Sequence, residues 1–97
     1  MTTEITTDFD VSDYLDSDEM IAAFLSAALE DEDADVFLAA LGHVAKAKGM
    51  GEIAKEAGLG RESLYKALKE GARPRYDTVA RVLSALGMKL TIVEKVA

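Results

Sequence analysis

The sequence predicts an all-α fold, a compact bundle of about five helices, followed by one short β-strand at residues 88–94. The first observation behind this prediction is that apolar residues recur at spacings of three and four along residues 20–86, the period of amphipathic helices. The second is that Gly49, Gly58, Gly71 and Gly87 follow such segments, where glycine commonly ends a helix. The third is the alternation of side chains in MKLTIVE near the C-terminus, which is typical of a strand.

Two helices are expected after an acidic N-terminal segment. Residues 1–16 alternate apolar and acidic side chains, and we expect them to form a strand or to be disordered until a partner orders them. A helical domain then occupies residues 17–97. Its first helix begins after a cap at Asp16 or Ser17 and ends near Glu30. The second runs from about Asp33 to Lys48 with an apolar stripe of Val36, Phe37, Ala40, Leu41 and Val44.

Residues 50–68 predict two short helices joined by a tight turn. Ile53, Ala54 and Ala57 form the apolar side of the first helix, and Gly58 stands where the chain must turn. The second helix buries Leu64, Ala67 and Leu68 and is expected to end at Gly71. This is the geometry of a helix-turn-helix, whose second helix can lie in the DNA major groove. A last helix is predicted from Tyr76 to Leu86.

Charge divides the chain into two unlike parts. The formal net charge is −7. Residues 1–35 contain twelve Asp or Glu and no Lys or Arg, whereas residues 36–97 contain six acids and eleven bases, a net of +5. Such an asymmetry indicates two partners of opposite charge. The alternative is that the acidic part only keeps the protein in solution.

Several functions are disfavoured by the composition. The 97 residues include no Cys, so disulfides and thiolate metal sites are excluded. His43 is the only histidine and Ser63 has no base beside it, so we expect no enzyme, no metal site and no cofactor. Neither a signal peptide nor an apolar run of ~18 residues is found, which predicts a cytoplasmic protein without a membrane partner.

DNA contact is the favoured function of the second half. The outward side of the second short helix carries side chains that suit base edges and phosphates. Arg61 could bind guanine, Glu62 could accept from cytosine, and Ser63 could meet either a base or a phosphate. The side chains expected on phosphates are Tyr65, Lys66, Lys69, Arg73 and Arg75. The alternative is an ordinary solvated helix face.

The lone C-terminal strand predicts a dimer. Unpaired backbone groups along an isolated strand are costly, and the same strand from a second copy can satisfy them across a two-fold axis. We therefore expect a homodimer contact at Leu90 and Ile92. The alternating N-terminal segment is the competing strand partner.

The segments FDVSDYLDSDEMIAAFLSAALED and FLAALGHVAKAKGMGEIAKEAGLGRESLYKALKEGARPRYDTVARVLSALGMKL resemble the addiction-module antidote family, HigA-like antitoxins with a helix-turn-helix domain. The most specific part is GLGRESLYKAL, in which Gly60 stands where a Ser cap is usual. The resemblance implies a lambda-repressor-like bundle and a dimeric protein that neutralises a RelE/ParE-type toxin and represses their shared operon.

A partner of that type is a small basic protein, which fits the acidic residues 1–35. For its contact we select the apolar residues Phe9, Val11, Tyr14 and Leu15. The double-stranded operator would meet the basic part of the chain. The alternatives are a prophage-type regulator without a toxin partner and a protein-binding module that has lost its DNA contact.

Overall fold

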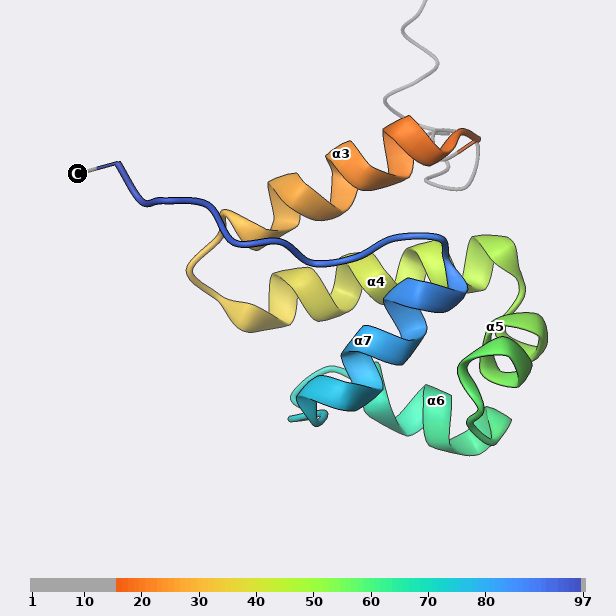
Figure 1. The fold of residues 1–97 in the computed structure, drawn as a ribbon. Helices are drawn as coiled ribbons and strands as arrows, with labels where there is room; N and C mark the ends of the chain where they lie inside the picture. Colours follow the sequence, from red (N-terminus) through yellow and green to blue (C-terminus); the bar gives the residue numbers. More distant parts are fainter. Residues whose placement is uncertain (1–15, 97) are drawn as a thin grey trace, which may run out of the picture.

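The computed structural model describes residues 16–96. Within this range the chain forms five helices and no strand: α3 (Asp18–Leu29), α4 (Ala34–Lys48), α5 (Met50–Ala57), α6 (Arg61–Ala67) and α7 (Tyr76–Ala85). Helices α3 and α4 lie antiparallel, and α5, α6 and α7 gather on the other side of α4 (Figure 1). The predicted helical bundle is therefore confirmed for the described part of the chain.

Side-chain caps begin the first two helices. The Ser17 hydroxyl accepts a hydrogen bond from the backbone N–H of Met20 at 3.1 Å, which satisfies one of the free donors at the start of α3. The Asp33 carboxylate accepts from the backbone N–H of Asp35 at 2.9 Å at the start of α4. Both helices begin within one or two residues of the positions that the sequence predicts.

One core joins the helices. Its fully buried large side chains come from four helices: Ile21, Leu41, Val44, Leu64 and Val82. The predicted stripe of α4 is wrong at Val36, which is 38% exposed, while Leu38 and Ala45 are buried. The reason is that α4 packs against α3 on one side and α5 on another, so the neighbouring helices decide which arc of α4 is covered.

Helix α6 is shorter than the sequence predicts. It ends at Ala67 with Leu68 as its C-cap, whereas we expected it to continue to Gly71. The N–H of Ala72 donates to the carbonyl of Lys69 at 2.9 Å, and Gly71 has φ +83°, so residues 68–72 form successive turns. The chain thus changes direction before the basic loop that carries Arg73 and Arg75.

The predicted strand at residues 88–94 is not present in the described structure. Met88 packs on the core and Leu90 borders a small cavity beside Leu25, but Ile92 is 97% exposed and Val93 79% exposed. The segment runs back along the α3–α4 pair as an irregular chain (Figure 1). A strand requires a neighbour to pair with, and residues 16–96 offer none.

Candidate nucleic-acid interface

The turn between α5 and α6 is held by backbone hydrogen bonds around one glycine. Gly58 has φ +74° and ψ +31°, the left-handed conformation in which a side chain is disfavoured. The next N–H, that of Leu59, donates to the carbonyl of Ala54 at 2.8 Å. Leu59 packs on the core, and Gly60 starts α6 in an extended conformation. The predicted pair of short helices is therefore present, with three connecting residues.

Helix α6 is anchored on one side and open on the other. Leu64 is fully buried, and Ala67 and Leu68 are half-buried. Six of the predicted DNA contacts form one exposed surface, which we call the α6 face: Arg61, Glu62, Ser63, Tyr65, Lys66 and Lys69. Residues three and four apart are neighbours on a helix, which groups the side chains that belong to α6. Lys69 follows the helix in the turns of residues 68–72 and lines the same groove as Tyr65 and Lys66.

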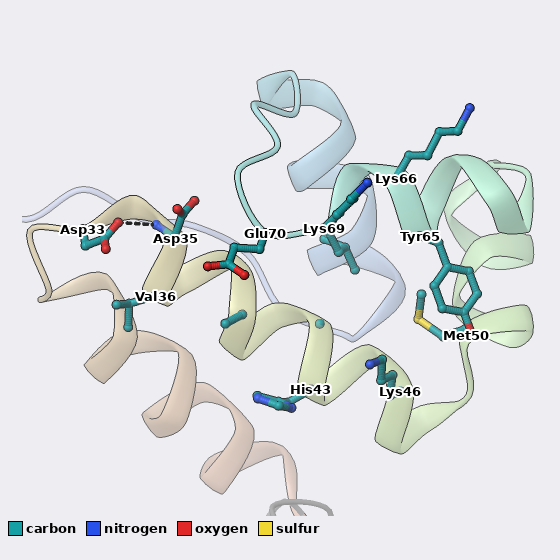
Figure 2. A pocket seen from close by; sticks show the side chains of 13 residues that line it. Asp33, Asp35, Val36, His43, Lys46, Met50, Tyr65, Lys66, Lys69 and Glu70 are labelled. Atoms are coloured by element: carbon teal, nitrogen blue, oxygen red, sulfur yellow. Dashed lines mark hydrogen bonds between the residues drawn. The ribbon is translucent and has the colours of Figure 1, made fainter.

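One interaction orders the start of the α6 face. The guanidinium carbon of Arg61 lies 5.5 Å from the centre of the Tyr65 ring, in cation–π geometry. Tyr65 is 43% exposed, and its ring points from α6 toward Met50 (Figure 2). The ring therefore restricts the positions that the Arg61 side chain can take without removing its donors from solvent.

The two loop arginines are exposed but paired. Arg73 lies 4.0 Å from the carboxylate of Asp35 on α4, and its side chain is 83% exposed. Arg75 lies 3.4 Å from Asp77, and its side chain is 85% exposed. The Asp35 oxygen that faces Arg73 is buried but accepts no hydrogen bond, since 4.0 Å is too long for one, and the Arg75–Asp77 pair is exposed. Both pairs are therefore weak, and both exposed guanidinium groups can exchange a carboxylate for a phosphate.

An open groove of about 850 Å³ lies between α4 and α6. Val36, Ala39, Gly42, His43 and Lys46 contribute one wall, and Tyr65, Lys66, Leu68 and Lys69 contribute the other. Figure 2 shows that the acidic Asp33, Asp35 and Glu70 gather at one end, while Lys46, Met50 and Tyr65 lie at the opposite end. The groove is therefore continuous with the α6 face.

Sequence reasoning missed the contribution of α4 to this surface. His43 entered the prediction only as a histidine without a catalytic or metal-binding partner, and Lys46 was not among the predicted DNA contacts. The signal that could have found them is their spacing, because residues 39, 43 and 46 share one side of a helix. Both His43 and Lys46 are exposed and line the groove.

Other predicted sites lie elsewhere. Phe9, Val11, Tyr14 and Leu15 fall outside the described residues. Leu90 is 39% exposed and Ile92 97% exposed. No three His, Cys, Asp or Glu side chains within residues 16–96 are placed to share a metal ion. In that same range, no helix combines the length and the apolar surface that crossing a bilayer requires.

Comparison with known proteins identifies one family. The model of a family described as "Probable addiction module antidote protein" matches residues 5–94. A protein of Haemophilus influenzae, described as uncharacterized, is 40% identical over 90 residues, which span 93% of this chain and 93% of that protein. No solved structure matches the chain.

Proposed function

The chain belongs to the family of probable addiction module antidote proteins, and we propose that it is an antitoxin that also binds and represses the operator of its own operon. Proteins of this family are regulatory and are not enzymes, as the sequence predicts for this chain. The proposal gives the protein two partners, DNA and a toxin, and assigns them to different parts of the chain.

The α6 face supports the DNA contact. It presents Arg61 at the first position of a short helix whose opposite side is anchored by the buried Leu64. The N-terminal residues of a recognition helix are the ones that reach base edges in the major groove. Lys66 and Lys69, further along the same surface, would meet phosphates. This placement of Arg61 is the observation that carries the proposal.

Charge supports a basic toxin as the second partner. The described acidic residues of the first third include Asp18 and Glu19 at the start of α3 and the run Glu30–Asp33 before α4, all of them exposed. Together with the acids of residues 1–15, they form a segment without a single base. A small basic protein of the RelE/ParE type would be attracted to such a segment.

A homodimer would complete the DNA-binding unit. Ile92 and Val93 are exposed apolar residues on a chain segment that has no strand partner within residues 16–96. Pairing of this segment with its copy across a two-fold axis would cover them and satisfy their backbone groups. Two α6 helices related by that axis would then reach two half-sites of an operator.

Expression of the native locus tests the two roles separately. We expect the purified protein to bind the duplex upstream of its own gene more tightly than random DNA, with an affinity that falls as salt rises. We also expect a small basic protein encoded beside it to co-purify with it. Operator binding without such a protein would identify a regulator that has no toxin partner. Co-purification without operator binding would remove the DNA part of the proposal.

A further inference from the structure

We propose that helix α4 supplies a second contact to DNA: Lys46, together with Lys66 and Lys69, forms a seat for one phosphate strand at the Met50 end of the α4–α6 groove. The inference rests on the proposed DNA function and extends it to a helix outside the α5–α6 pair. It assigns a binding role to Lys46.

Position is the first argument. Lys46 lines the same groove as Tyr65, Lys66 and Lys69, which belong to the α6 face. A helix in the major groove is flanked by the phosphate strands that border that groove. If α6 lies in the major groove, an element beside α6 is close to one of the two phosphate strands. In this protein that element is α4, which forms the opposite wall of the α4–α6 groove (Figure 2).

Charge is the second argument. Within residues 16–96, none of Lys46, Lys66 and Lys69 forms an ion pair, in contrast to Arg73 and Arg75. Lys46 lies on the α4 wall of the groove, and Lys66 and Lys69 lie on the opposite wall, where the Lys66 side chain extends away from α4 (Figure 2). A phosphate strand that passes across both walls would meet all three charges, and lysine binds phosphate as a compact point charge. His43 lies one turn before Lys46 on the same wall and adds an N–H donor.

The acidic end of the groove limits where a DNA phosphate strand can lie. Asp33, Asp35 and Glu70 gather at the far end and would repel a phosphate there (Figure 2). The strand must therefore cross the groove at its lysine end and cannot follow its length. Glu70 is the acid that adjoins Lys69 in sequence, so removal of its charge should strengthen DNA binding.

Two lysines of one helix turn provide a matched experiment. Lys46 and Lys48 are both exposed and both stand in the last turn of α4, so Lys46→Gln and Lys48→Gln change the net charge and the helix-end interaction equally. They differ by two positions, which places them on different sides of the helix, and only Lys46 lines the groove. Thermal melts of both variants would verify that they fold alike.

The affinity of each variant is measured by fluorescence anisotropy on the upstream duplex and on random DNA over a salt series. Loss of one phosphate contact lowers the slope of log K against log salt by about 0.9 and weakens binding about fivefold near 0.15 M salt. We expect this loss for Lys46→Gln on both duplexes, a change below twofold for Lys48→Gln, and tighter binding for Glu70→Gln.

Three outcomes would overturn the inference. If Lys46→Gln and Lys48→Gln bind DNA equally well while Arg61→Ala loses its preference for the operator, α4 makes no contact and the proposed function stands. If Lys46→Gln leaves DNA binding intact but releases an acidic protein, the groove belongs to that protein. If the unchanged protein binds neither duplex, the proposed DNA function fails as well.

Discussion

The guanidinium carbon of Arg61 lies 5.5 Å from the ring centre of Tyr65, one turn further along α6. An exposed cation–π pair of this kind contributes about 0.5–1 kcal/mol. Its consequence concerns geometry more than stability, because an arginine that is held in place loses less side-chain freedom when it binds a base. In the proposed DNA complex, Tyr65 would therefore position Arg61 in addition to any phosphate contact of its own hydroxyl.

The first prediction separates these two roles of Tyr65. Tyr65→Phe keeps the ring and removes the hydroxyl, so it should retain the preference for the operator over random DNA and lose only a little affinity on both. Tyr65→Ala removes the ring and should reduce the preference itself. The ratio of the two affinities, measured for each variant, distinguishes them. Equal ratios for Phe and Ala would show that the ring does not position Arg61.

The second prediction concerns Arg73 in the basic loop. Its side chain is 83% exposed and lies 4.0 Å from the Asp35 carboxylate, too far for a hydrogen bond, so we expect it to exchange that carboxylate for a phosphate. Arg73→Ala should weaken binding to operator and random DNA by the same factor and lower the salt slope by about 1. Arg81→Ala, an exposed arginine of α7, is the control with the same charge change. Indistinguishable salt slopes for the two variants would exclude Arg73 as a phosphate contact.

The third prediction compares two glycines, one with a positive φ and one in a helical conformation. Gly58 has φ +74°, so Gly58→Ala should lower the free energy of unfolding by about 1–2 kcal/mol. Gly42 is helical, and an added Cβ would lie 3.9 Å from the carbonyl oxygen of Leu68, an ordinary van der Waals distance. Gly42→Ala should therefore raise the free energy of unfolding by about 1 kcal/mol. Denaturant titrations would measure both, and a destabilised Gly42→Ala variant would mean that α4 and Leu68 cannot accept the methyl group.

The fourth prediction concerns the C-terminal segment. Deletion of residues 90–97 removes Leu90 and Ile92 but keeps Met88, which packs on the core, so the helices should remain folded. If the segment pairs with its copy, the full chain is a dimer and the shortened chain is a monomer with weaker operator binding. Sedimentation equilibrium measures both masses. A full chain that is already monomeric, or a shortened chain that is still dimeric, would contradict the dimer proposal.

Local signals explain why most of the fold could be predicted from the sequence. Ser17 and Asp33 cap helices through contacts with residues two or three positions away, and Gly49 and Gly58 end helices by their own conformation. The buried Leu64 follows from the helical period. Each of these features depends on neighbours in the sequence, so a single sequence carries enough information for them.

The structure differs from the prediction at positions whose surroundings are determined by contacts between distant parts of the chain. Val36 has the period of a core residue but faces the groove, because the positions of α3 and α5 determine which arc of α4 is buried. The alternating residues 88–94 have the pattern of a strand, but pairing depends on a second strand and not on the pattern alone. Lys46 was not predicted for the same reason, because only the packing of α4 beside α6 places it in the same groove as Tyr65 and Lys66.

The most direct measurement of the central claim is the operator preference of Arg61→Ala. Wild-type protein and the variant are titrated into the upstream duplex and into random DNA at one salt concentration, and the ratio of the two affinities is compared. We predict that the variant loses about 1–3 kcal/mol on the upstream duplex and much less on random DNA, because the proposed function assigns Arg61 a contact to a base. An equal loss on both duplexes, or no loss on either, would contradict the assignment of α6 as the helix that recognises the operator.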